Sequence, residues 1–419
     1  MGLNFPAAPL VGDVYPVPAL PGVPQWTWNG VSWKCGTIDT ANYILKSGGT
    51  MTGPLILAAD PVDAMGAVTK QYAESLLGQQ DNFLVNGFMD VSQENGATAM
   101  APNSYPADQW LMQGTAGFST QQQNGGPLYG GGIDKQIAIT SPASYSHVAT
   151  NTAYFVQYIE GLRFARAGWG TAQGRPLSLG FWVYSNAGGV MSVCMRNAAS
   201  TRSYVIPITV PAATWAYRTA LFPPCLDGAW PTDNTSSANL FFSFLPTSSL
   251  IASAANTWIS GVNVIIAPTA TNMFTPGATT GNYLTGITLV MGNVPVPQAR
   301  VPYMRKPYLE ELLACCRYWQ WNRYGEVGHG HSAAASIFHH SPVVPYRVTP
   351  TLSIAAGASV YVETMPWNVG CNITNPTVNG GHANWSGVEY QLGGTYSAAA
   401  TNNQMMGIYD QKIKMSARL

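Results

Sequence analysis

Charged side chains are scarce in this chain of 419 residues. Only 9% of its residues are charged, whereas an ordinary soluble domain has about 25%. Nineteen basic and nineteen acidic residues cancel, so no net field draws the chain onto nucleic acid or an anionic membrane. We therefore expect neither nucleic acid binding nor membrane insertion.

The sequence also lacks a targeting segment and a membrane span. Residues 1–24 have neither a basic start nor an apolar run of signal-peptide length. The most apolar stretch, 240–267, is interrupted by Pro246, Asn256 and Asn263. We interpret it as buried strands, because a lipid span needs about 20 mainly apolar residues.

Cysteines are few and form no recognisable pattern. Their scatter over a long chain is neither a disulfide framework nor a zinc pattern, so we expect reduced, buried thiols. They are Cys35, Cys194, Cys225, Cys315, Cys316 and Cys371.

Aromatic and uncharged polar residues take the place of charge. Hydrophobic residues make up 46% and aromatic residues 11% of the chain. Aromatic faces and short hydroxyl or amide groups suit stable assemblies, and they also suit neutral glycans, since neither needs charge. Composition leaves both classes of partner open.

The first 35 residues read as an extended arm that ends in a hairpin. Six prolines between positions 6 and 24 fix an extended backbone and forbid a helix. Asn29-Gly30 is a strong hairpin-turn signal, and tryptophans flank it on both sides. We predict a small aromatic hairpin here.

A specific motif follows the arm. Leu45–Leu55 reads Leu-Lys-Ser-Gly-Gly-Thr-Met-Thr-Gly-Pro-Leu, and Ala67–Tyr72 reads Ala-Val-Thr-Lys-Gln-Tyr. This pair closely resembles the shaft element of phage tail fibre proteins, which in that family is a trimerisation unit. The resemblance implies a homotrimer.

The residues of this region fit a helix with one narrow apolar seam. Asp60 can cap the helix and Pro61 suits its first position. A helix of about 17 residues is marginal alone, so identical neighbours around an axis would stabilise the seam. The seam residues, at three- and four-residue spacing, are Val62, Met65, Val68, Tyr72 and Leu76.

From residue 84 to residue 303 the hydrophobic period changes to two. In 177–184, Leu and Val positions alternate with Ser178, Gly180, Trp182 and Tyr184. Turn clusters separate further strand-like runs, which predicts a two-sheet antiparallel sandwich. These runs are 191–195, 204–208, 240–245, 258–266 and 283–291.

Three segments of this region resemble the opening strands of a jelly-roll module of phage receptor-binding proteins. They are 84–93 (Leu-Val-Asn-Gly-Phe-Met-Asp-Val-Ser-Gln), 105–110 (Tyr-Pro-Ala-Asp-Gln-Trp) and 157–161 (Gln-Tyr-Ile-Glu-Gly). The family pattern usually has Arg where Gln109 stands, so an ion pair from that position is absent here.

A helix is predicted to connect this module to a final domain. Pro307 suits the helix start, and Glu310 and Glu311 in the first turn match the helix dipole. The segment also resembles the Glu-Leu-x-x-Cys-x-Arg-Tyr helix of the same family. Its expected apolar face consists of Leu309, Leu312, Leu313, Cys316 and Trp319.

The remaining residues, 325–419, predict a C-terminal β-sandwich with clearer strands at 353–362 and 388–392. In the resembled proteins such a domain faces the receptor. Aromatic side chains among asparagines could hold a neutral sugar by stacking and amide hydrogen bonds, and the other interpretation is core or inter-subunit filling. The candidate receptor contacts are Tyr361, Trp367, Asn384, Trp385 and Tyr390.

His329 and His331 are the candidate metal ligands. Alternating residues of a strand share a face, so three chains around an axis would offer six imidazole nitrogens. The other interpretation is a polar surface loop flanked by glycines. No other cofactor is expected.

An enzymatic alternative is a capsule or lipopolysaccharide depolymerase, which needs two carboxylates about 5 to 9.5 Å apart. Serine-hydrolase, zincin and phosphate-loop motifs are absent from the sequence. Isolated acids are more often turn, cap or edge residues, so we expect no enzyme. The isolated acids are Asp108, Asp134, Glu160, Glu363 and Glu389.

The sequence thus predicts a mainly β homotrimer with a short helical, coiled-coil shaft. The expected parts are an attachment arm (1–35), a trimerising shaft (36–82), a jelly-roll sandwich (83–305), a connecting helix (306–324) and a receptor-facing β-domain (325–419).

The expected function is that of a phage tail fibre, assembled in the host cytoplasm and located in the virion. Its arm would bind tail or baseplate proteins, and its tip would bind a bacterial surface glycan or an outer-membrane receptor. A connector that binds only other phage proteins is the structural alternative.

Overall fold

The chain divides into two compact units in a computed structural model, Met1–Thr69 and Lys70–Leu419. The residues that the structure describes are 4–18, 24–36, 82–115, 117–128, 132–261, 263–275, 278–322, 326–332, 334–354, 360–364, 370–384, 387–397, 405–408 and 413–419. The predicted seam from Val62 to Leu76 lies outside them, so the trimerising shaft stays a prediction.

The first unit contains the predicted aromatic hairpin. Its three-stranded sheet has the order β1 (Val14–Tyr15), β2 (Trp26–Trp28) and β3 (Trp33–Cys35). The Asn29 side chain accepts hydrogen bonds from the backbone N–H groups of Val31 and Ser32 at 3.0 and 2.8 Å. Gly30 has a φ of +95°, a value that favours glycine. The hairpin is confirmed.

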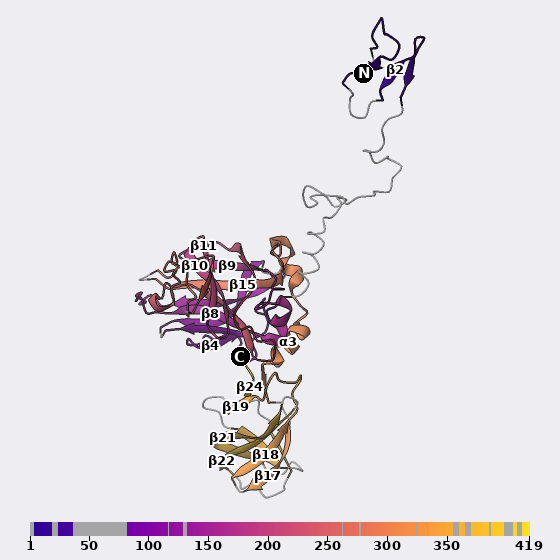
Figure 1. The fold of residues 1–419 in the computed structure, drawn as a ribbon. Coiled ribbons are helices and arrows are strands. Elements are labelled where there is room, and N and C mark those ends of the chain that lie inside the picture. The colour runs from indigo at the N-terminus through magenta and orange to yellow at the C-terminus, as the bar shows by residue number, and fades with distance from the viewer. Residues whose placement is uncertain are drawn as a thin grey trace. The chain divides into compact units, whose positions relative to one another are not determined.

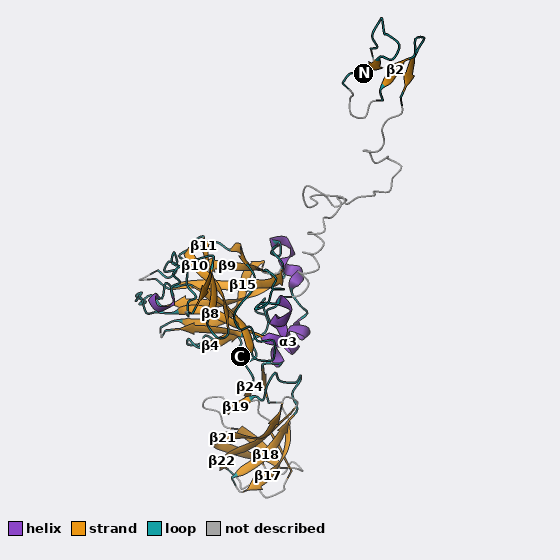
Figure 2. Cartoon of the chain, in the orientation of Figure 1, coloured by secondary structure: helices purple, strands orange, loops and turns teal. Residues whose placement is uncertain are grey.

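The second unit begins with a two-sheet antiparallel sandwich, as the period of two predicted (Figures 1 and 2). One sheet has seven strands in the order β14 (Trp258–Ser260), β11 (Arg202–Val210), β10 (Gly189–Asn197), β13 (Ser236–Ser243), β8 (Ala153–Glu160), β5 (Trp110–Gly114) and β4 (Ser104–Ala107). The other has five, in the order β12 (Ala216–Phe222), β9 (Leu177–Ser185), β15 (Thr280–Met291), β7 (Ile133–Ser141) and β6 (Ser119–Leu128).

The core between the two sheets is built by strand alternation. Leu179, Phe181 and Val183 of β9 point into it and pack with inward residues of β10 and β13. The intervening residues of β9, such as Tyr184, therefore lie on the outer face of the five-stranded sheet.

The segment 84–93 is not a strand, which corrects the jelly-roll expectation for these residues. It forms buried turns, because Asn86 has a left-handed φ of 56°. The Asn86 amide donates to the carbonyl oxygens of Val91 and Asp108 and accepts from the Val91 N–H, at 2.7 to 3.0 Å. Side-chain bonds thus replace a strand ladder here.

The apolar stretch 240–267 is only partly as predicted, because 240–245 and 264–267 are buried whereas most residues of 248–261 are exposed or half-buried, and only part of the stretch is strand. β13 ends at Ser243 and β14 covers only Trp258–Ser260. Residues 264–267 pack over outward residues of the seven-stranded sheet, such as Cys194 and Phe241, and Ile266 forms only a single bridge, with Ile251. The interruptions by Pro and Asn explain why the run does not continue as one strand.

The connecting helix is shorter than the predicted 306–324. Helix α3 (Tyr308–Cys316) ends where the chain turns into β16 (Trp319–Trp321), which pairs with β24 (Ile413–Ser416). The predicted apolar face is partly wrong, since Leu309 is 63% exposed while Glu311 is buried. Glu311 is inside because its carboxylate accepts the Asn86 N–H at 2.5 Å.

The remaining short helical segments of the described residues lie in the sandwich part of the chain. They are α2 (Gly161–Phe164), η2 (Ala165–Ala167), η3 (Ser248–Leu250) and η4 (Gln298–Met304). No helix in the described ranges has the length and apolar character to cross a membrane.

The C-terminal domain is a closed barrel, which corrects the predicted second sandwich. β23 pairs with both β17 and β20, so the sheet closes on itself and keeps no free edge. The strand order is β17 (Glu326–Ser332), β18 (Ala335–His340), β22 (Gly387–Tyr396), β21 (Gly370–Asn384), β20 (Val360–Thr364) and β23 (Met405–Ile408).

A separate three-stranded sheet accompanies the barrel. It has the order β16, β24 and β19 (Thr351–Ile354). The single strand predicted over 353–362 is therefore wrong, because β19 and β20 belong to different sheets. The strand predicted at 388–392 is confirmed within β22.

Five cysteines carry free thiols, and the side chain of Cys371 lies outside the described residues. Cys194, Cys225, Cys315 and Cys316 are buried as predicted, whereas Cys35 is exposed at the end of β3.

Candidate functional site

The receptor contacts predicted in the C-terminal domain are not brought together as a site. Tyr390 is wrong as a contact, because its side chain is 0% exposed. Tyr361 is half-buried. Trp367 and Trp385 lie outside the described residues, as does the side chain of Asn384.

Tyr390 points into the barrel because it lies on the inward phase of β22, beside Phe338. Its hydroxyl donates to Glu326 Oε2 at 2.7 Å, and Glu326 Oε1 lies 2.5 Å from His340 Nδ1. The Tyr346 hydroxyl lies 3.2 Å from His340 Nε2. Burial, together with the neighbouring Glu326 carboxylate, raises the pKa of Tyr390. These four side chains form a buried network that holds the barrel.

His329 and His331 both lie on the outer face of β17, at half-buried and exposed positions. The ring of His339 on β18 is 6.5 Å from that of His329, measured between centroids. Within the described ranges, no group of three or more His, Cys, Asp or Glu side chains could hold a metal ion. An axial site shared by three chains stays a prediction.

Three of the acids considered for a depolymerase, Glu160, Asp134 and Asp108, are engaged in fixed contacts. Glu160 is buried, and Arg317 binds it through two nitrogens at 2.6 and 3.0 Å. Asp134 pairs with Arg305 at 3.0 Å. The Asp108 carboxylate accepts from the Gln93 backbone and side chain, at 3.0 and 2.6 Å.

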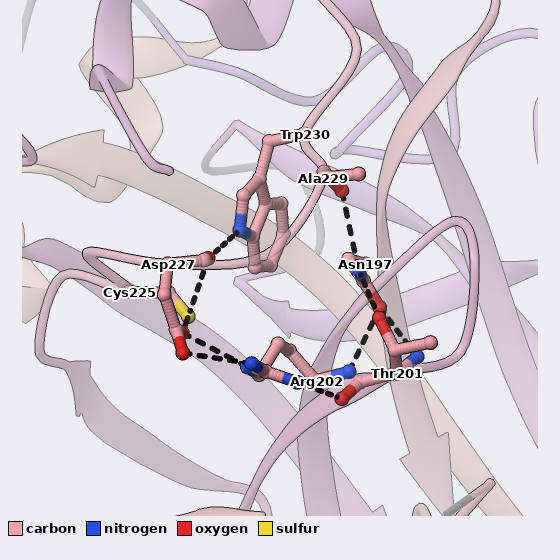
Figure 3. Close-up of polar contacts among 7 residues, drawn as sticks. All are labelled: Asn197, Thr201, Arg202, Cys225, Asp227, Ala229 and Trp230. Carbon is pink, nitrogen blue, oxygen red and sulfur yellow. Dashed lines mark hydrogen bonds and ion pairs between the residues drawn. The ribbon is translucent and has the colours of Figure 1, made fainter. Parts of the chain in front are cut away.

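A cluster at the 223–230 loop unites a thiol, a carboxylate and a guanidinium (Figure 3). Arg202 donates to both oxygens of Asp227 at 2.9 and 2.7 Å, and Trp230 Nε1 donates to the Asp227 carbonyl at 3.0 Å. The bond from Arg202 lowers the pKa of Asp227 to about 2. Burial raises the pKa of the Cys225 thiol to about 11. A protonated thiol is a poor nucleophile, so we interpret the cluster as a clamp that fixes this loop on β11.

A hollow of about 890 Å³ lies where α2 and the 233–234 loop face residues 345–349. The guanidinium groups of its two arginines bind other groups of the same chain. Arg317 binds Glu160, and Arg347 donates to the carbonyl oxygens of Asn234, Ala417 and Arg418. We interpret this hollow as a structural junction.

A second cleft, of about 290 Å³, lies on the outer face of the five-stranded sheet. Tyr184 of β9 stands directly opposite Tyr283 of β15 in the ladder. Trp215 directly precedes β12, whose first residue pairs with Val183. Three aromatic side chains therefore stand in one row across three strands.

The geometry of this row leaves ring faces available. The Tyr184 ring lies 5.7 Å from the Trp215 ring at 51°, and 5.6 Å from the Tyr283 ring at 70°. Tilted and edge-to-face rings cover less of one another than stacked rings do, and each of the three side chains is half-buried. The row can therefore offer apolar faces to a ligand.

Part of the same sheet face is covered by the chain itself. Val296 and Val301 pack over Trp182, and the Tyr217 hydroxyl donates to the Val296 carbonyl at 2.5 Å. The cleft lies beside this covering segment.

Two amide side chains complete the cleft. Asn186 Oδ1 accepts from the Gly281 N–H at 2.7 Å, which leaves its Nδ2 as a donor. Gln136 is 8% exposed, and its Oε1 has no hydrogen-bond partner. A buried acceptor without a partner costs about 1–3 kcal/mol. Gly125 and Gly126 of β6 form the remaining wall.

The cleft is electrically neutral. None of its lining residues carries a charge at neutral pH. Burial, with a smaller contribution from Tyr184, raises the pKa of Tyr283, so its hydroxyl stays protonated. Aromatic faces, amide groups and phenol hydroxyls without charge can stack on a sugar ring and bind its hydroxyls.

The sequence analysis missed these cleft residues as a site, although one signal was present. Tyr184 stands on the polar phase of the alternating 177–184 strand, where an aromatic residue must face outward. Trp215 and Tyr283 join it only through strand pairing, which the sequence does not specify.

Comparison with known proteins gives only distant likenesses. No protein-family model matches the sequence, and no curated protein matches it.

Parts of the chain are similar to solved structures. One is the enzymatically active domain of tailspike protein 4 of bacteriophage CBA120, with 13% identity, a TM-score of 0.27 and coverage of 50% of this chain and 21% of that one. Another is the family 11 carbohydrate-binding module of Clostridium thermocellum in complex with a mixed-linked tetrasaccharide, with 11% identity, a TM-score of 0.23 and coverage of 47% and 96%.

A third is TmCBM61 in complex with β-1,4-galactotriose, with 10% identity, a TM-score of 0.25 and coverage of 50% and 97%. This chain spans about a fifth of the length of the tailspike domain. TM-scores below 0.3 are too low to carry an argument about this chain.

Proposed function

We propose that this protein binds an uncharged glycan, without cleaving it, in the cleft on the five-stranded sheet. The row of Trp215, Tyr184 and Tyr283 carries the proposal. Stacking on aromatic faces releases water from the apolar faces of sugar rings, and the amides of Gln136 and Asn186 supply bonds to hydroxyls.

The setting that we propose is a phage tail fibre that adsorbs to the bacterial surface. The shaft-like motif at Leu45–Leu55 and the helix motif at Ala67–Tyr72 support it through their resemblance to that family. A homotrimer would present three clefts, and the effective concentration of the second and third sites would raise a weak single-site affinity. A native mass three times that of one chain is the expected result, and a monomer would refute this part.

The test of glycan binding uses the full chain on an array of bacterial surface oligosaccharides. We expect the wild-type protein to bind uncharged glycans and Trp215→Ala to bind at least about 30-fold more weakly, since a central aromatic contact is worth about 2 kcal/mol. Tyr303→Ala is the matched control, because Tyr303 is an 85% exposed aromatic residue outside the cleft.

Three outcomes would contradict the proposal. Equal binding by Trp215→Ala and the wild type would mean that the glycan-binding site lies outside this cleft. Release of new reducing ends from a bound glycan would favour the depolymerase, and failure to bind any glycan together with capture of a second tail protein would favour the connector.

A further inference from the structure

We infer that Gln136 decides what the cleft selects, with its amide oxygen accepting a hydrogen bond from a hydroxyl of an uncharged sugar. This inference rests on the proposed glycan binding and adds the residue that gives it specificity.

Gln136 is the unusual polar residue of the cleft. It lies on the outward phase of β7, next to the inward Ile137, and pairs with Gln123 of β6. Its Nε2 has one weak contact, 3.4 Å from Gln123 Oε1, while its Oε1 has no partner. Buried amide oxygens are normally bonded, so this unpaired oxygen is the candidate acceptor for a ligand hydroxyl.

The wall over Gln136 is built without side chains. Gly125 has a φ of +140°, and a Cβ atom there would lie 3.1 Å from Gln136 Nε2. Gly126 has a φ of +127°, and its Cβ would lie 2.7 Å from the Ile133 carbonyl oxygen. The register of β6 also shifts between Asn124 and Leu128. Only glycine suits this irregular edge, and it leaves the amide reachable from the cleft.

The amide needs one small movement to meet a ligand. Oε1 is covered in the unbound protein. Rotation about the last side-chain torsion of Gln136 turns it toward the cleft, and for Gln that torsion has a broad profile with low barriers. Because the bond to Gln123 is long, little is lost when the amide turns.

The Gln136 amide oxygen can only accept a hydrogen bond, and this restricts the class of ligand that it can bind. A sugar hydroxyl donates a hydrogen bond to an amide oxygen, whereas a carboxylate or phosphate group offers only acceptors at neutral pH. No charged side chain lines the cleft to offset an anion, and an unpaired buried charge is costly. The cleft therefore favours neutral sugars over acidic ones.

The experiment compares two substitutions of similar size on the glycan that the wild type binds best. Gln136→Met removes the acceptor and should weaken binding about tenfold. Gln136→Glu keeps an acceptor whether or not it is protonated, and should stay within about threefold of the wild type. Gln121→Met is the matched control, because Gln121 pairs with Ala138 on the same sheet face but does not line the cleft.

The outcomes separate this inference from the proposed function. Unchanged binding by Gln136→Met overturns the role of Gln136, and equal loss in Gln136→Glu and Gln136→Met assigns the contact to Nε2 and overturns the acceptor. If Trp215→Ala also binds as the wild type does, the cleft itself is not the site. Thermal unfolding of each variant shows whether it folds, and preferential binding of acidic sugars by the wild type would also overturn the inference.

Discussion

The sandwich and the barrel place similar residues in opposite directions. In the sandwich, Tyr184 and Tyr283 stand outward on the five-stranded sheet, half-buried beside the Gln136 amide. In the barrel, the Tyr390 side chain points inward and its hydroxyl donates a hydrogen bond to Glu326. The phase of a residue relative to its core, and not its type, decides whether it can meet a ligand.

The architecture explains this difference. A narrow closed barrel has one interior, which side chains must fill, so a polar group that enters it needs a partner inside. A sandwich sheet buries one face in the shared core, and its other face can stay open to solvent. On the outer face of the sandwich, an aromatic ring can therefore stay partly exposed and an amide can lack a hydrogen-bond partner at a moderate cost in stability. Inside the barrel, an unpaired polar group would destabilise the fold more.

The strongest test of this contrast removes the acid of the barrel network. Glu326→Ala leaves His340 and Tyr390 buried without their shared partner. A buried polar group left without its hydrogen-bond partner costs about 1–3 kcal/mol, so with two such groups we expect a loss of about 2–6 kcal/mol in the free energy of unfolding by urea. Glycan affinity, measured below the unfolding transition, should not change.

Glu389→Ala is the matched control for this experiment. Glu389 lies on the same domain, but it is on the outer phase of β22 and its carboxylate is 3.7 Å from His339 Nδ1. We expect its removal to cost less than about 1 kcal/mol, as for an exposed pair. Equal losses in the two variants would contradict the inward network.

A pair of tyrosine substitutions tests the contrast at intermediate size. Tyr184→Ala should weaken glycan binding about tenfold, which corresponds to about 1.4 kcal/mol, and should change stability less than binding. Tyr390→Phe removes only the hydroxyl that donates to Glu326. It should cost about 1.5–3 kcal/mol of unfolding free energy, the value of a bond to a charged group, and leave glycan affinity unchanged.

The measurements are isothermal titration of the glycan and urea unfolding of the same two preparations. A loss of affinity in Tyr390→Phe would return the receptor contact to the barrel. Full affinity in Tyr184→Ala would remove the middle of the aromatic row.

The sequence predicted local structure well where a local rule applies. Asn29-Gly30 specifies a hairpin turn, and the alternation in 177–184 specifies a strand with a core face, and both are confirmed. The prediction from the sequence failed where pairing with strands distant in the sequence decides the local structure. Helix α3 stops at Cys316 because the next residues pair with β24, about a hundred residues later.

The prediction of the candidate site failed for a related reason. The sequence indicates Tyr390 as a contact because it is an aromatic residue near several asparagines, but the closure of the barrel turns its side chain inward. Trp215, Tyr184 and Tyr283 come from three strands that are neighbours only in the sheet. The sequence predicts that these three side chains point outward, but it does not predict that they lie next to one another.

The smallest expected effect concerns the contact where the two regions meet. Glu94, in the sandwich part, pairs with Lys414 Nζ at 2.7 Å and with Arg418 Nη1 at 2.5 Å. Burial alone would raise the pKa of Glu94, but Arg418 and Lys414 together lower it below the ordinary value of 4.5. A carboxylate with a lowered pKa adds stability above its unfolded-state pKa, and this stability is lost as the pH falls through the lower folded-state value.

We therefore compare the wild type with Glu94→Gln at pH 7 and at successively lower pH below 4.5. The wild type should be more stable at pH 7 by no more than about 1 kcal/mol, because the site is partly solvated. The difference between the two proteins should shrink on acidification, and subtracting the variant removes the contribution of every other acid. A difference that stays constant down to the lowest pH would mean that the ion pairs of Glu94 add nothing to the stability of this contact.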